Sequence, residues 1–325
     1  MVEISALNGS TILITGATGL IGSTLVETLL TATDCEIYAT CRQQETAQQR
    51  FQHILPHPRL HLLTYDVTQP LETDNRFDYI IHAASPASPA SFSQYPVEVM
   101  MANILGVRHL LDYGQRHQMK RMLFISSGEI YGEGDGTPFQ EHDSGYIDSL
   151  SPRACYPSSK RAAETLCAAY VAEKNVDVVI ARLCHTYGPG FTEKDNRVYA
   201  QFLRNVLRGE DIVMKSAGRQ MRSWIYVQDA VDAILTLLLK GEKGEAYNVA
   251  DAQSCITIRS LAEKIAALAD RQVIIDIPQD ATQGNTTPIS CATFSTKKIE
   301  ALGWNPRFTI DEGLRQTLQR LQNQG

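Results

Sequence analysis

A glycine-rich turn between an apolar strand and an apolar helix constrains the fold of this chain most strongly. Thr11-Ile-Leu-Ile-Thr15 runs directly into Gly16-Ala-Thr-Gly19-Leu-Ile-Gly22, and an apolar helical pattern follows. Glycines let a backbone approach a pyrophosphate, whose charge is stabilised by the free amides at the start of the helix. The strand–turn–helix context predicts a dinucleotide site, although the spacing is GxxGxxG rather than GxGxxG. We expect cofactor contacts from Gly16, Thr18, Gly19, Leu20, Ile21 and Gly22. The alternative is a turn that only packs a helix against a strand.

Short β-rich apolar runs alternate with helical patterns through the first half of the chain. They predict strands at Thr11–Thr15, Glu36–Thr40, Leu60–Tyr65, Tyr79–Ala83, Arg121–Ser126 and Val176–Arg182, and helices at Leu20–Leu30, Pro96–Gln115 and Ser158–Glu173. Strands and helices in this order are joined most easily by right-handed crossovers into a parallel sheet. The predicted fold is therefore α/β, a doubly wound parallel sheet of the Rossmann type with a smaller α/β substrate-binding lobe.

The alternation loosens beyond about Gly188. Helices are predicted at Val198–Arg208, at Gln228–Leu239 and after Thr309, while Ala246–Ala250 reads as a strand that returns to the main sheet. The predicted dinucleotide-binding domain therefore comprises residues 1–187 with about 226–250. The predicted substrate-binding lobe comprises residues 188–225 and 251–325.

Charge and cysteine usage exclude several classes of protein. The 30 basic and 36 acidic residues give a net charge of -6 without a run of Lys and Arg, so a nucleic-acid partner is not expected. The seven cysteines have neither CxxC pairs nor histidine-rich spacing, which argues against metal sites and disulfides and favours a reducing, cytoplasmic setting. The most apolar run, Ala233–Leu239, is too short to span a bilayer, and the first residues lack the features of a signal peptide, so no membrane association is expected.

Tyr156 and Lys160 form the strongest candidate catalytic pair. Their spacing of four, at the start of a helical pattern, places both side chains on one helix face. A phenol with a pKa of about 10 is a poor base at neutral pH, but a neighbouring ammonium group favours its ionised form. Tyr156 would then accept the proton of a substrate hydroxyl while hydride leaves the carbon. Such pairs also occur on ordinary helices, so the motif indicates a catalytic site only in combination with the glycine turn.

Three other positions follow predicted strands, where such sheets bind ligands. Ser127 would supply a hydroxyl that polarises the substrate oxygen, or would only satisfy a turn. Asp66 would contact the adenine region or cap a loop. The second strand ends near Arg42 rather than in the acid that usually binds a ribose 2′-hydroxyl, so Arg42 would accept the 2′-phosphate of NADP or is a solvated surface charge.

Together with the glycine turn and the Tyr-x-x-x-Lys pair, five further segments resemble the extended short-chain dehydrogenase/reductase family. Within it, they are similar to the nucleotide-sugar decarboxylases, dehydratases and epimerases, and most of all to the UDP-glucuronate decarboxylase branch. The segments are His82-Ala-Ala-Ser-Pro-Ala-Ser-Pro89, Ser127-Gly-Glu-Ile-Tyr-Gly132, Pro152-Arg-Ala-Cys-Tyr156, His185-Thr-Tyr-Gly-Pro189 and Arg222-Ser-Trp-Ile-Tyr-Val-Gln-Asp229. The likeness covers nearly the whole chain.

The resemblance implies a role for each matched residue. Ser127 would be the hydroxyl donor, Glu129 a second acid/base group, Tyr156 the base, and Lys160 its activator and a contact of the nicotinamide ribose. Further cofactor contacts are expected at Val67, Ala83, Ala84 and Ser85, and substrate contacts at Ser85, Pro86, Glu129, His185, Arg197 and Arg222, with Arg222 on the diphosphate. The implied cofactor is NAD, with NADP left open. The implied substrate is a UDP-linked sugar for polysaccharide biosynthesis, and the implied assembly is a homodimer through the Tyr-bearing helix.

The expected reaction begins with oxidation of the C4 hydroxyl of a nucleotide hexose. A C5 carboxylate would then be lost as carbon dioxide, and return of the hydride would give a pentose. A 4-epimerase and a 4,6-dehydratase share the first step; Gly128 stands where the dehydratases carry an Asp, and Glu129 argues against an epimerase. Three departures from the family pattern weaken the substrate assignment: His185 in place of Asn, the missing acid of the second strand, and Val213-Met-Lys-Ser-Ala-Gly218. A non-catalytic dinucleotide sensor is the alternative of another class.

Overall fold

The computed structural model describes residues 3–191, 195–277 and 289–323. Its centre is a seven-stranded sheet in the order β10-β6-β5-β4-β1-β2-β3, in which every neighbouring pair is parallel. The strands are β1 (Thr11–Thr15), β2 (Glu36–Cys41), β3 (Leu60–Thr64), β4 (Tyr79–His82), β5 (Arg121–Ser127), β6 (Val178–Leu183) and β10 (Ala246–Val249). The predicted doubly wound parallel sheet is confirmed, and the strand predicted at Ala246–Ala250 does join it, beside β6.

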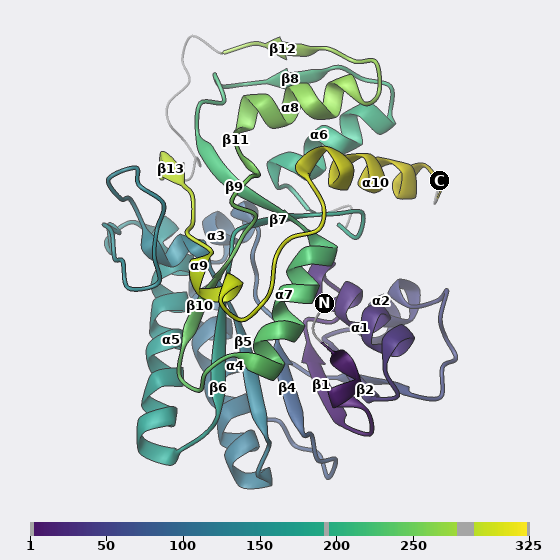
Figure 1. Cartoon of the computed structure of the whole chain (residues 1–325), viewed down its shortest axis with the longest axis vertical. Helices are drawn as coiled ribbons and strands as arrows, with labels where there is room; N and C mark the ends of the chain where they lie inside the picture. Colours follow the sequence, from purple (N-terminus) through teal and green to yellow (C-terminus); the bar gives the residue numbers. More distant parts are fainter. Residues whose placement is uncertain (1–2, 192–194, 278–288, 324–325) are drawn as a thin grey trace.

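Helices cover both faces of this sheet (Figure 1). One layer contains α4 (Pro96–His117) and α5 (Cys155–Lys174), which lie side by side; α1 (Leu20–Ala32) and α7 (Val227–Lys240) pack together in the other. Ile12 and Ile14 of β1 belong to one hydrophobic cluster and Leu13 to another, because successive side chains of a strand point to opposite faces. β1 is accordingly apolar at its three central positions and has a threonine at each end. Shorter helices of this part are η1 (Ile4–Leu7), α2 (Gln44–Arg50), α3 (Pro89–Gln94), η2 (Gly128–Tyr131) and η3 (Pro152–Ala154).

A smaller unit lies beyond the carboxyl ends of the main strands, at the top of Figure 1. Its elements are β7 (His185–Tyr187), β8 (Ile212–Met214), β9 (Met221–Tyr226), β11 (Cys255–Thr257), β12 (Val273–Ile275), β13 (Cys291–Ala292), α6 (Val198–Leu207), α8 (Ile258–Ala267) and α10 (Ile310–Gln322). Strand β9 pairs with β7, β11 and β13, and β8 pairs with β12. The helix predicted after Thr309 is α10, which begins with a capping box formed by Thr309 and Glu312.

The segment after β13 returns to the main sheet. Phe294, Ile299 and Trp304 belong to the same hydrophobic cluster as β1 and α7, and α9 (Lys297–Glu300) contacts β10. This part of the predicted lobe therefore packs against the dinucleotide domain. The exact division at residues 187, 225 and 250 stays a prediction.

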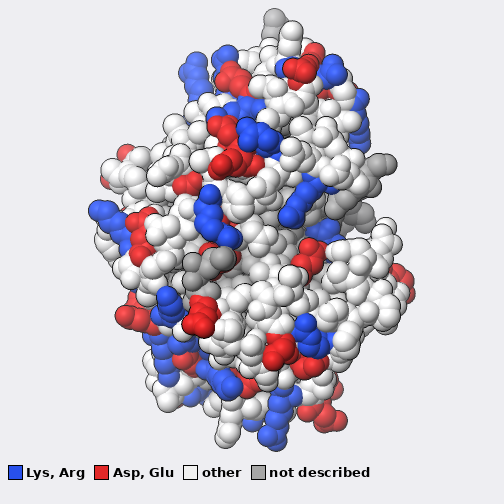
Figure 2. All heavy atoms as spheres, turned by 45° about the vertical axis from the view of Figure 1, so that its right-hand side comes forward, with Lys and Arg blue, Asp and Glu red and all other residues white. Residues whose placement is uncertain are grey.

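The surface shows no single basic field on the face drawn in Figure 2, where Lys and Arg are interspersed with Asp and Glu. Among the described helices, none is both long and apolar enough to cross a membrane.

Candidate active site

The glycine turn lies at the point where the sheet order reverses. β1 pairs with β2 on one side and with β4 on the other, and the crevice outside the carboxyl ends of such strands is the usual ligand site of open α/β sheets. Gly16 has φ +66°, and a Cβ there would lie 2.8 Å from the carbonyl of Ala83. A Cβ on Gly22 would lie 2.3 Å from the Gly16 oxygen. Glycine is therefore required at both positions, and the backbone is left open to close approach by a ligand.

The first turn of α1 fits a pyrophosphate. Its N-cap is Gly19, which has no side chain to accept a hydrogen bond from the first helical amides. Free amides at this end of a helix carry partial positive charge and bind anions. Ile21, of the same turn, lines a cavity together with Ala83 and Ser85 from the end of β4. The half-buried Thr18 lies within the turn, and the amide of Ala84 donates to Thr15 Oγ1 at 3.2 Å.

Other predicted cofactor contacts lie apart from this cavity. Asp66 is exposed and its Oδ1 accepts hydrogen bonds from the amide and hydroxyl of Thr68, both at 2.9 Å, so it caps a loop as the alternative reading expected. Val67 packs near Gly106 of α4. Arg42 is exposed at the end of β2.

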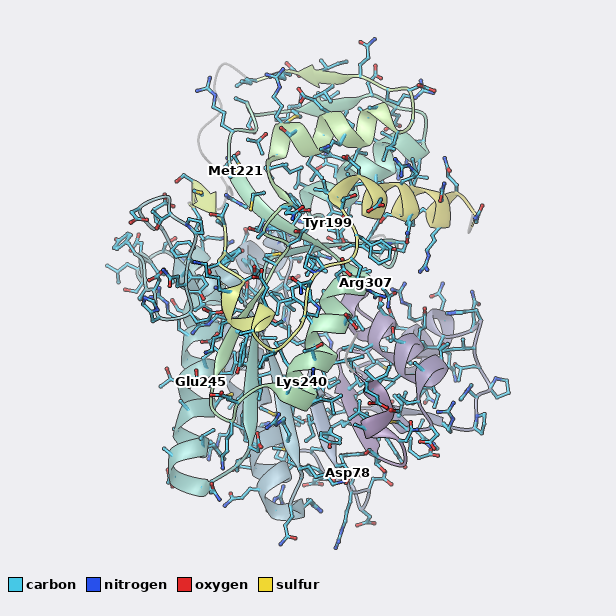
Figure 3. All side chains as sticks on the ribbon, viewed as in Figure 1. Asp78, Tyr199, Met221, Lys240, Glu245 and Arg307 are labelled. Carbon is cyan, nitrogen blue, oxygen red and sulfur yellow. The ribbon has the colours of Figure 1, made fainter. Side chains whose placement is uncertain are left out.

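The cavity has a volume of about 380 Å³ and lies between the main sheet and the smaller unit. In Figure 3, Tyr199 of its lining and Asp78 mark opposite ends of the strands, so the cavity is at the carboxyl end. All four predicted catalytic residues line it: Ser127, Glu129, Tyr156 and Lys160. So do the predicted substrate contacts Ser85, His185, Arg197 and Arg222, whereas Pro86 is not among the lining residues although its neighbours Ala87 and Pro89 are.

Tyr156 is buried at the start of α5, with only 7% of its surface exposed. Burial and then the negative charge of Glu129 raise its pKa to about 12, while a hydrogen bond with Ser127 acts in the opposite direction. The ammonium nitrogen of Lys160 lies 5.9 Å from the centre of the Tyr156 ring. Desolvation therefore outweighs the lowering of the Tyr156 pKa expected from the Lys160 ammonium group.

Lys160 is buried, and among the described residues no carboxylate forms a hydrogen bond with it. Its Nζ donates to the carbonyl oxygen of Ile125 at 2.8 Å and lies 4.6 Å from the centre of the Phe124 ring. Burial lowers its pKa to about 7, against the opposing charge of Glu164, one helical turn further on. Glu164 itself is held by Ser126 at 2.5 Å and by Arg182 at 2.7 Å. Glu164 follows Lys160 by four residues on α5, so this buried network holds the helix face that carries both Tyr156 and Lys160.

Three cationic or polar groups face the cavity from the smaller unit. Arg222 is 4% exposed, and its hydrogen bonds among the described residues all go to carbonyl oxygens, those of Met221, Ile289 and Ser290. Its charge is therefore left for an anionic ligand. Arg197 is already paired with Asp195 at 2.5 Å. His185 has a pKa lowered to about 3 by burial and by the nearby arginines, and its Nδ1 has no hydrogen-bond partner in the part of the chain described.

The sequence interpretation missed several residues of this site. Four aromatic side chains line the cavity: Phe92, Tyr199, Trp224 and Phe294. Arg153, which is not part of the lining, forms an ion pair with Glu129. The Pro-Arg-Ala-Cys-Tyr segment contained Arg153, but no spacing rule links it to Glu129. The aromatic residues come from four separate segments, which only the tertiary fold brings together.

Comparison with known proteins decides the family. Residues 12–250 match the model of the NAD dependent epimerase/dehydratase family. The chain belongs to this family. The match spans the glycine turn, the four predicted catalytic residues and strand β10. It confirms the resemblance found in the motifs, and with it the assignment to an NAD-dependent class of enzymes.

Two UDP-glucuronic acid decarboxylases are similar in sequence to this chain over most of its length. UDP-glucuronic acid decarboxylase 5 of Arabidopsis thaliana is 32% identical over 303 residues, which is 93% of this chain and 86% of the relative. UDP-glucuronic acid decarboxylase 1 of Danio rerio is 32% identical over 95% of this chain and 72% of the relative.

Solved structures confirm the fold. The UDP-N-acetylglucosamine 4-epimerase of Methanobrevibacter ruminantium superposes with a TM-score of 0.84 at 22% identity, over 98% of this chain and all of that one. A dTDP-glucose 4,6-dehydratase of Bacillus anthracis, in complex with NAD, superposes with a TM-score of 0.81 at 22% identity, over 96% of each chain.

Proposed function

We propose that this protein is a UDP-glucuronate decarboxylase that oxidises the sugar at C4 and regenerates its cofactor within one cycle. The observation that carries the proposal is the convergence of Ser127, Glu129, Tyr156 and Lys160 in one cavity beside the glycine turn. The decarboxylases of plants and fish support it by their similarity over more than nine-tenths of the chain.

NAD supplies the chemistry of hydride acceptance and return, and the residues of the glycine turn fit it. We assign its contacts to Gly16, Thr18, Gly19, Leu20, Ile21, Gly22, Ala83, Ala84 and Ser85, with Tyr156 and Lys160 at the nicotinamide end. The close packing around the turn supports this, because only glycine fits at Gly16 and Gly22. Arg42, Asp66 and Val67 remain predicted contacts of the adenosine end, and an NADP preference through Arg42 stays open.

The chain's own residues move the protons. Ser127 donates a hydrogen bond to the C4 oxygen, and Tyr156 takes the hydroxyl proton as hydride leaves C4. The resulting β-keto acid loses carbon dioxide: the electrons of the broken bond between C5 and the carboxyl carbon form an enolate on the C4 oxygen. Tyr156 and Ser127 stabilise that oxygen, and C5 takes a proton through Glu129. Return of the hydride to C4 and of the Tyr156 proton to the C4 oxygen completes a UDP-pentose.

The nucleotide sugar would extend from the reacting carbon toward the smaller unit. Arg222 is the best diphosphate contact, because its guanidinium donates only to carbonyl oxygens within the described residues. Arg197 would share its guanidinium with Asp195. His185 is assigned a substrate contact, because its buried Nδ1 lacks a protein partner among the residues described.

A homodimer would form through the helix layer that contains α4 and α5. Tyr95, Val97 and Met101 are exposed by 57%, 65% and 41% at the start of α4, and Ala162 and Ala169 are exposed on α5. Large exposed apolar side chains beside small ones favour helix packing between copies. Ala163 of the same helix is fully buried in the core and takes no part in this surface. The free thiols of all seven cysteines fit the cytoplasm.

Product analysis with purified protein tests this proposal. Incubation with UDP-glucuronate should release carbon dioxide and yield a UDP-pentose in equal amounts. Formation of UDP-galacturonate would instead identify a 4-epimerase, and a 4-keto-6-deoxy sugar from UDP-glucose or dTDP-glucose would identify a 4,6-dehydratase. Tight NAD binding without any product would favour the non-catalytic sensor.

A further inference from the structure

Glu129 is the only one of the four proposed catalytic side chains that is held by an opposite charge within the described residues. Arg153 Nη2 donates to both of its carboxylate oxygens, at 2.8 and 3.1 Å, and each side chain is 20% exposed. Arg153 does not line the cavity, whereas Glu129 does. The guanidinium therefore reaches the carboxylate from the protein side and leaves its other side to the ligand.

The same guanidinium lies over the ring of Phe92, and that ring stacks on the ring of Tyr156. Its carbon lies 4.6 Å from the centre of the Phe92 ring, and that ring stacks on Tyr156 at 4.6 Å with 24° between the planes. Phe92 is 2% exposed and Tyr156 7%, so the two stacked rings are buried. Arg153 lies in η3, three residues before Tyr156, and one side chain therefore fixes both Glu129 and the ring that supports the base.

We propose that Arg153 is a positioning residue that neutralises and orients Glu129, so that a sugar carboxylate and a developing phenolate can occupy the same cavity. This inference rests on the proposed function, since it concerns the same C4 oxidation. Without Arg153 the negative charge of Glu129 would oppose both new negative charges in a site of low dielectric constant. The pKa of Tyr156 responds accordingly, because Glu129 raises it and Arg153 lowers it.

The test measures the near-ultraviolet absorbance of reduced nicotinamide after the holoenzyme is mixed with UDP-glucuronate or with UDP-glucose. Arg153→Gln should slow cofactor reduction by about a hundredfold, the low end of what one acid/base group contributes. The loss should be larger with UDP-glucuronate, which carries a charge, than with UDP-glucose. Arg153→Lys keeps the charge and should stay within a few fold of the wild type, and Arg259→Gln, in the exposed pair with Glu263, is the matched control.

A double variant separates positioning from a merely structural role. When Glu129→Gln is added to Arg153→Gln, the unbalanced charge disappears, so cofactor reduction should recover in part while formation of the UDP-pentose, which needs the proton delivered through Glu129, stays slow. Thermal unfolding of each variant checks that the fold is intact. Losses that multiply in the double variant, equal losses with both sugars, or wild-type rates in Arg153→Gln would each overturn the inference.

The two substrates keep the two proposals apart. If the wild-type protein reduces its cofactor only with UDP-glucose, the decarboxylase proposal fails, while the comparison of Arg153 variants on that step still decides the role of Arg153. If it does so with neither sugar, both proposals fail.

Discussion

The buried ammonium group of Lys160 should leave a measurable mark on the pH dependence of stability. Lys160 is 3% exposed, and burial lowers its pKa from 10.5 to about 7. Between these values the unfolded chain holds a proton that the folded chain has released, so the free energy of unfolding rises with pH. The slope approaches about 1.4 kcal/mol per pH unit, and protonation near pH 7 reduces it there, so the gain from pH 7 to pH 9 is about 2 kcal/mol. Below the folded pKa both states are protonated and the slope vanishes.

Lys160→Met removes this titration and fills a similar volume. Urea unfolding of both proteins, freed of bound nucleotide, at several pH values between 6 and 9 gives the difference curve, in which histidine and cysteine titrations cancel. The variant should lose the rise of about 2 kcal/mol and should also lose turnover. Parallel curves for the two proteins would refute the claim that a charged Lys160 is disfavoured by burial.

Three other perturbations test separate parts of the site and surface. Tyr156→Phe should retain bound NAD but lose turnover by about a thousandfold, measured by nucleotide extraction and product assay; full activity would remove Tyr156 as the base. Gly22→Ala should lower the free energy of unfolding by about 1–3 kcal/mol and release NAD, because the added carbon would lie 2.3 Å from the Gly16 oxygen; unchanged thermal unfolding would contradict that contact. Val97→Glu with Met101→Glu should yield monomers in sedimentation, and an unaltered dimer would place the interface elsewhere.

Local patterns were sufficient for most of the fold. The strand and turn of the dinucleotide site are contiguous in sequence, and Tyr156 and Lys160 share one helix face, so spacing alone locates them. Strand β10 could be anticipated because its apolar residues follow a helix. The end of each main element differs from the expected one by three residues or fewer, for example α5, which begins at Cys155 rather than Ser158.

Tertiary contacts account for what the sequence could not show. The ion pair of Arg153 with Glu129 joins η3 to η2, and Phe92 reaches the same site from α3. No periodicity relates these segments. The raised pKa of Tyr156 is likewise a property of burial, which a Tyr-to-Lys spacing does not report. Phe294 packs into the main core from a segment more than 160 residues after Ser127, a contact that no local pattern reports.

The central claim is an internal hydride cycle at C4 coupled to loss of the sugar carboxylate. UDP-glucuronate carrying deuterium at C4, incubated with the purified protein without added cofactor, tests it directly by mass spectrometry of the nucleotide sugars. The account predicts a UDP-pentose that keeps the deuterium and one carbon dioxide for each pentose. A pentose without deuterium, or unchanged UDP-glucuronate with no carbon dioxide, would contradict it.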